Sequence, residues 1–145
     1  MEEKTPSVLL TTPSWLLTQT AMHAQRIVAE AFAAENSRGY HFRLLATLME
    51  FGPSSQAALG RHTGIDRSDI VATVNELVAA GYVERSPDPA DGRRNIISLT
   101  TAGKRRHRHL SELVDTIQDK IFAPLSSTER ATLAGLLTKV LAHHS

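Results

Sequence analysis

Two adjacent arginines, Arg93 and Arg94, are placed for nucleic-acid chemistry by the segment that precedes them. Residues 87–92 contain two prolines, two aspartates and a glycine, a composition that predicts a turn. A guanidinium at the tip of such a turn can bind phosphate or enter a narrow minor groove of DNA. Asp91 is close enough in sequence to orient Arg93 through an ion pair, although an exposed pair alone contributes little to stability.

A second group of candidate contacts lies on a helix expected to begin after Asp66, its predicted N-cap, and to stop at Gly81. Apolar residues recur at helical spacing and predict a buried stripe of Ile70, Val74, Leu77 and Val78. The opposite face is small and polar, which would allow close approach to base edges; it comprises Ser68, Ala72 and Asn75, with Val71 at its margin and Arg67 in the first turn. The simpler interpretation is a solvated helix face without a ligand.

Both groups are positioned by the segments between residues 54 and 100. The pair Ser54-Ser55 is expected to cap a short helix, which ends in a turn at Thr63-Gly64. Two strands are predicted at residues 82–86 and 95–99, joined by the charged turn. This order of helix, turn, helix and hairpin predicts a helix-turn-helix with a wing, in a mainly α protein with a small β-hairpin. The second helix of such a unit fits the major groove of DNA.

Helices are also predicted on the N-terminal side of this unit. The first long helix is expected to take Ser14 as its cap, and a second is expected at residues 41–51, with Phe42, Leu45 and Met49 on one face. The first helix carries apolar residues on more than one side, and a single chain of this size could hardly cover them all. We therefore expect it to contribute to a dimer core.

Two further helices are predicted after residue 100. The first carries an apolar line and is broken by Pro124. The second begins at Ser126 and Glu129, whose spacing of three residues is typical of a capping box.

The composition indicates a single domain with an aliphatic core. The 145 residues are 41% hydrophobic but only 5% aromatic, and none is cysteine, which excludes disulfides, cysteine-ligated zinc and thiol redox chemistry. Acidic Glu2 and Glu3 and the lack of a long apolar run argue against a signal peptide or a membrane span. We expect a soluble cytoplasmic protein.

The formal net charge of +1 hides an uneven distribution. Residues 54–109 hold nine Lys/Arg against six Asp/Glu, a net +3, whereas the remainder holds seven against nine, a net −2. A basic middle between mildly acidic ends fits a phosphate-facing module on a neutral scaffold. The basic run at residues 104–109 could lean on phosphates, but its side chains fan around a helix, so a solvated face is the simpler interpretation.

The seven histidines show no pattern typical of a metal site. His107 and His109 would point to different sides of a helix, and His143 and His144 are neighbours without a third ligand nearby. No Ser/His/Asp order, phosphate-binding glycine loop or carboxylate pair stands in a motif context. We therefore expect no enzymatic activity, no metal and no cofactor.

The middle of the chain resembles the MarR family of bacterial winged-helix regulators. The matching stretches are residues 56–59, 64–68, 77–85, 88–93 and 98–103. The most specific part is Asp-x-Arg in the wing followed by Leu-Thr-x-x-Gly, and the order of the helices extends the resemblance to nearly the whole chain. Before Arg93 this chain has Gly92, where the family often has a larger residue, so both Arg93 and Arg94 stay candidates for the groove.

The resemblance implies a homodimeric repressor that binds a pseudo-palindromic operator in double-stranded DNA. Residues 1–38 would form an N-terminal dimerisation helix, 39–100 the DNA-binding lobe and 101–145 the C-terminal dimerisation helices. Carried over by position, bases would be read by Arg67, Ser68, Val71, Ala72 and Asn75. Arg93 would be the wing arginine, and phosphate contacts would come from Ser55, Gln56 and Arg61.

The resemblance also implies a small aromatic acid as an effector that releases DNA. The candidate ligand residues are Trp15, His23, Arg26, His41 and Arg43, for which ordinary packing and surface charge are the simpler interpretation. A different class of function stays open as well, since a winged helix can serve as a protein-docking module without reading DNA.

Overall fold

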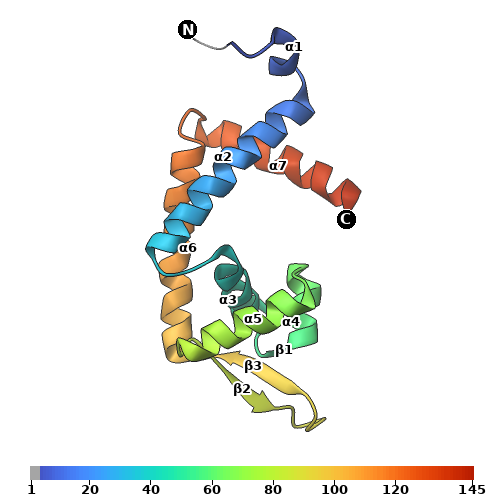
Figure 1. Ribbon diagram of the computed structural model, residues 1–145, viewed down its shortest axis with the longest axis vertical. Coiled ribbons are helices and arrows are strands. Elements are labelled where there is room, and N and C mark those ends of the chain that lie inside the picture. Colours follow the sequence, from blue (N-terminus) through green and yellow to red (C-terminus); the bar gives the residue numbers. More distant parts are fainter. Residues whose placement is uncertain (1–3) are drawn as a thin grey trace.

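The computed structural model describes residues 4–145, which are mainly helical with one small antiparallel sheet (Figure 1). The helices are α1 (Ser7–Leu10), α2 (Pro13–Ala34), α3 (Gly39–Phe51), α4 (Gln56–Thr63), α5 (Arg67–Ala79), α6 (Thr101–Ile121) and α7 (Ser127–His144). The strands are β1 (Ser54–Ser55), β2 (Val83–Pro87) and β3 (Asn95–Leu99). The predicted fold class, mainly α with a hairpin wing, is confirmed. Short α1 was not predicted.

The molecule is elongated, and its two ends are built from different secondary-structure elements (Figure 1). The long helices α2 and α6 pack side by side, and α7 follows α6 at one end of the molecule. At the other end α3, α4, α5 and the sheet form a compact lobe, from which the β2–β3 hairpin projects. No helix between residues 4 and 145 is long and apolar enough to cross a membrane.

The sheet has three strands rather than the two that were predicted. Its order is β1-β3-β2, and both pairings are antiparallel, with Ser54 opposite Ile97 and Arg85 opposite Ile97 from the other side. Strand β1 escaped prediction because it has only two residues, and the second of them also caps α4. Its pairing anchors the start of α4 to the wing strand β3.

The core is centred on α3, whose buried residues differ from the predicted face. Leu44, Leu45 and Leu48 are buried, whereas Met49 is 46% exposed and Phe42 only half-buried. The predicted face is therefore wrong for Met49, because α3 is covered by α4, α5 and α6 on the side of the three leucines. The stripe predicted on α5 is largely confirmed, since Ile70, Val74 and Leu77 are buried and Val78 is half-buried.

Side-chain hydrogen bonds confirm the predicted starts of α4 and α7. Ser55 accepts from the Ala58 nitrogen at 3.1 Å, and Ser126 and Glu129 form both bonds of a capping box. Ser14 was wrongly predicted as a cap: α2 already begins at Pro13, which suits the first helical position because its missing N–H needs no partner there. Asp66 does precede α5, but its side chain makes no capping bond in the described structure.

The basic run at the start of α6 is not simply a solvated face. The Arg106 guanidinium lies over the Tyr82 ring, 5.4 Å from its centroid, and donates to the carbonyl of Glu35. His107 stacks on Phe42 with ring centroids 5.8 Å apart, and burial lowers the pKa of this imidazole. These two side chains therefore hold α6 against the rest of the fold.

Candidate nucleic-acid interface

A cleft of about 750 Å³ lies between the helix-turn-helix and the wing, and we call it the wing cleft. Helices α4 and α5 form one wall, and the end of the hairpin forms the other. Seven of the predicted DNA contacts line it, namely Ser55, Gln56, Arg61, Arg67, Val71, Arg93 and Arg94. The structure thus brings together residues that are up to 39 positions apart in the sequence.

The wing cleft is strongly cationic. Its lining includes four arginines and no Asp or Glu. Arg61 and Arg67 form no ion pair within residues 4–145, so their guanidinium groups are available to a phosphate or a guanine edge. An anion in this cleft would also meet the N-terminus of α4, whose backbone N–H groups carry partial positive charge.

The wing tip is held by its aspartates through backbone hydrogen bonds. The Asp91 carboxylate accepts from the Arg93 nitrogen at 3.1 Å, and the Asp88 carboxylate accepts from the Ala90 nitrogen at 2.9 Å. The predicted ion pair of Asp91 with Arg93 is long, at 3.7 Å, and a similar contact reaches Arg94 at 3.9 Å. Asp91 therefore shapes the turn more than it holds a guanidinium. The Arg93 side chain is 95% exposed and Arg94 is 68% exposed.

The predicted base-reading face of α5 is exposed along its whole length. Arg67, Ser68 and Ala72 lie on it, and Val71 is 38% exposed, which leaves an apolar spot where a thymine methyl could pack. Ser68, Ala72 and Asn75 do not line the wing cleft and continue the surface beyond it.

Asn75 has a partner that the sequence did not indicate. Its Oδ1 accepts a hydrogen bond from the guanidinium of Arg85, which projects from β2 ten residues further along the chain. The two N–H groups of the Asn75 amide remain free to donate to a base edge. Arg85 is a cation between α5 and the wing that sequence reasoning missed, because strand β2 alone gives no sign of a contact with α5.

The five predicted ligand residues have varied surroundings in the single chain. Trp15, His23 and Arg26 lie on α2, with an Arg26 guanidinium nitrogen 3.1 Å from His23 Nδ1. On α3, Arg43 donates to the Thr63 carbonyl, and His41 contacts Glu76 of α5. None of the five lines the cavity that lies between α2 and α6.

The comparisons with known proteins agree with this geometry. Residues 37–94 match the sequence profile of the MarR family. The HTH-type transcriptional repressor NicR of Pseudomonas putida is 34% identical over 100 residues, which cover 69% of this chain and 63% of that protein. The matched stretches span 46–63% of the length of three curated relatives, including NicR.

Solved structures are similar over most of the chain. The crystal structure of a probable transcriptional regulator from Pseudomonas aeruginosa superposes with a TM-score of 0.80 at 32% identity, covering 91% of this chain and 98% of that one. The structure of a mutant of E. coli MarR complexed with operator DNA gives a TM-score of 0.75 at 26% identity, covering 87% and 91%. The chain therefore belongs to the MarR family of transcriptional regulators.

Proposed function

We propose that this protein is a sequence-specific DNA-binding repressor that acts in the cytoplasm as a homodimer on a pseudo-palindromic operator. The observation that carries the proposal is the wing cleft, in which four arginines from α4, α5 and the hairpin face one space. Helix α5 would lie in the major groove and the hairpin tip would reach the adjacent minor groove. NicR, which is named a repressor, supports the sign of regulation.

The proposed homodimer is supported by the apolar surface at the far end of the molecule. Helix α7 has no buried residue, and Leu136, Val140 and Leu141 are each more than half exposed. Met22 of α2 is 58% exposed as well. Leu136 and Val140 are four residues apart and share one face of α7, and an exposed apolar face of this kind supports an interface there. We infer the division proposed from the sequence, with residues 39–100 as the DNA-binding lobe between two dimerisation segments, 1–38 and 101–145.

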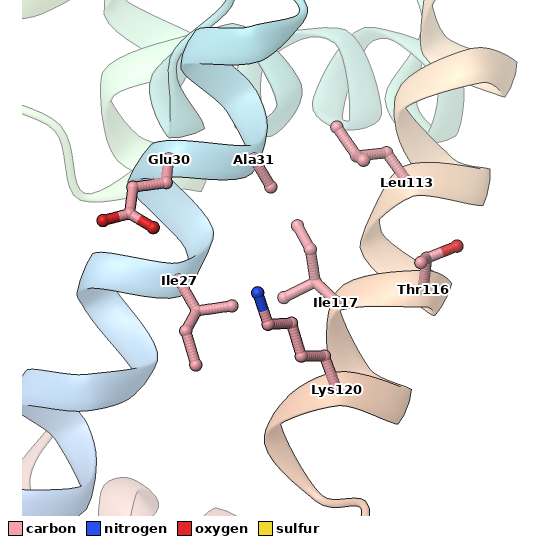
Figure 2. Close-up of a pocket in the computed structure, with 7 residues that line it drawn as sticks. All are labelled: Ile27, Glu30, Ala31, Leu113, Thr116, Ile117 and Lys120. Atoms are coloured by element: carbon pink, nitrogen blue, oxygen red, sulfur yellow. The ribbon is translucent and has the colours of Figure 1, made fainter.

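A small aromatic or phenolic acid is the effector that we propose. A cavity of about 270 Å³ lies between α2 and α6, close to the lower end of the ~300–1,000 Å³ range of ligand pockets. Figure 2 shows Ile27 and Ile117 facing this cavity from the two helices and Lys120 extending from α6 into the space between them, where the ammonium could pair with a carboxylate. None of the five predicted ligand residues lines this cavity, and their contact with an effector in the dimer stays a prediction. A panel of phenolic acids that changed neither the melting temperature nor operator affinity would overturn the effector.

The DNA-binding function is tested by selecting duplexes from a random pool with the purified protein. We expect an enriched sequence with two related half-sites about one helical turn apart, because a two-fold dimer presents two α5 helices. Affinity should fall steeply with salt: for each phosphate neutralised, log Kd should rise by about 0.9 for a tenfold increase in salt concentration. A protein-docking module would instead enrich no sequence, and its binding to a partner would not show this dependence.

A further inference from the structure

The C-terminal half of α5 is held by two residues from outside the helix-turn-helix. Glu76, one residue after Asn75, accepts hydrogen bonds from the Arg38 guanidinium at 2.8 and 2.9 Å. His41 Nε2 lies 2.5 Å from the same carboxylate. Because these contacts stabilise the charged form, led by the hydrogen bond with His41, the pKa of Glu76 lies below its usual value. Glu76 is therefore an ionised anchor for two groups at the start of α3.

Arg38 lies at the junction between the long helix α2 and the DNA-binding lobe. It is the N-cap residue of α3 and the last residue of the short connection that joins α2 to α3 (Figure 1). The other end of this connection is also fixed, because the Glu35 carboxylate lies 2.8 Å from His109 Nε2 on α6. Residues 35–38 thus link α5 on one side to the long helices on the other.

This link has a geometric consequence for a dimer. If α2 and α6 belong to the dimer core, the angle between that core and α5 decides how far apart two α5 helices are held. The packed lobe fixes α5 against α3 and α4, and the Arg38–Glu76 pair adds a contact to the connection itself. The two oxygens of one carboxylate receive two guanidinium nitrogens, a geometry that restricts direction as well as distance.

We propose that Glu76 is a positioning residue that sets the angle of α5 for two successive half-sites, an inference that rests on the proposed DNA-binding function. Glu76 reaches Arg38, and through the connection the α2–α6 pair, without itself reading a base. An exposed ion pair adds little to folding stability, and Glu76 is 44% exposed. Its effect should therefore appear in operator recognition rather than in the melting temperature.

A purely electrostatic role and a positioning role of Glu76 predict opposite changes in DNA affinity for the same substitution. Glu76→Gln removes a negative charge from the DNA-facing lobe, and this change alone would tighten binding to a polyanion. Loss of positioning would instead weaken binding to the operator. Glu84→Gln is the matched control, because Glu84 is exposed on β2 and forms no ion pair within the part of the chain that the structure describes.

The experiment titrates the full chain and its variants against the selected operator, a random duplex of equal length, and operators with one base pair added or removed between the half-sites. We expect Glu84→Gln to bind the operator as tightly as the native protein or more tightly. Glu76→Gln should bind the native operator about 3- to 30-fold more weakly, without weakening on random DNA. It should also discriminate less between the native and altered spacings, a change that an unrelated loss of stability would not produce.

Two further variants keep the inference testable if Glu76→Gln folds poorly. Arg38→Gln removes the same pair from outside the helix-turn-helix and should show the same loss of spacing discrimination. The exchange Arg38→Glu with Glu76→Arg should recover part of the operator affinity, because it restores the pair with reversed charges. Glu76→Gln tightening operator binding as Glu84→Gln does would overturn the positioning role. Failure of the native protein to prefer any operator would overturn the proposed function instead.

Discussion

Replacing Gly103 with alanine is expected to destabilise the fold by at least about 2 kcal/mol, because the structure has no room for a methyl group there. A Cβ atom on Gly103 would lie 1.9 Å from the carbonyl oxygen of Tyr82 and 3.2 Å from Cδ2 of Leu99. The Tyr82 oxygen belongs to the backbone and accepts from the Thr100 nitrogen at 3.1 Å, so it cannot turn aside as a flexible side chain could. The start of α6 would have to move away from the connection between α5 and β2.

The matched control is Gly135→Ala in the middle of α7. Nothing lies within 4 Å of a Cβ atom at that position, so alanine should leave stability unchanged or raise it by up to about 1 kcal/mol through helix propensity. Denaturation midpoints measured at one protein concentration would compare the two variants fairly, since a dimer gains stability with concentration. Equal midpoints for both variants would show that the close approach of Gly103 to Tyr82 does not constrain the fold.

Gly103 also illustrates what sequence reasoning could and could not supply. The sequence Leu-Thr-x-x-Gly, together with Asp-x-Arg of the wing, is the most specific part of the family resemblance, but spacing alone gives no reason for its glycine. The reason is a contact between segments 21 residues apart, in which α6 starts directly against the Tyr82 carbonyl. Thr100, in the same motif, caps α6 by accepting a hydrogen bond from the Gly103 nitrogen, and a contact between residues this close in sequence is of a kind that spacing can predict.

The candidate site shows the same difference between local contacts, which the sequence predicts, and contacts between separate elements, which it does not. Strand β3, the capping box at Ser126 and the exposed face of α5 depend on nearby residues, and the structure agrees with all three. Two contacts join separate elements, namely the hydrogen bond of Arg85 with Asn75 and the ion pair of Arg38 with Glu76. No periodic pattern in the sequence predicts either contact. Exposed charged residues have many possible partners in a sequence, and only the packing of the helices selects one.

Arg93→Ala is expected to weaken operator binding by about 1–3 kcal/mol, or about 5- to 150-fold. The Arg93 side chain is 95% exposed at the tip of a hairpin whose turn the two aspartates hold by hydrogen bonds, so it is accessible to a groove. Arg94 is less exposed, and its backbone carbonyl and nitrogen both bond within the turn. We therefore expect Arg94→Ala to have the smaller effect.

The control for charge is Arg108→Ala, which removes the same positive charge from an exposed position of α6 outside the wing cleft. If the guanidinium of Arg93 lies in a narrow minor groove, replacing A·T pairs by G·C pairs beneath the wing should weaken the native protein and leave Arg93→Ala nearly unaffected. Arg108→Ala should respond to the base change as the native protein does. These affinities are best measured by titrating labelled duplexes at one salt concentration, because salt alone changes them strongly.

The ranking of the two wing arginines separates two mechanisms. A contact made by Arg93 alone gives a large loss for Arg93→Ala, sensitivity to the bases beneath the wing, and a small, base-independent loss for Arg94→Ala. If Arg94→Ala shows the larger loss of affinity and no longer responds to the bases beneath the wing, Arg94 is the groove residue. Gly92 has then shifted the turn by one position. If neither substitution exceeds Arg108→Ala, the wing contributes only charge, and α5 must supply the specificity of the complex.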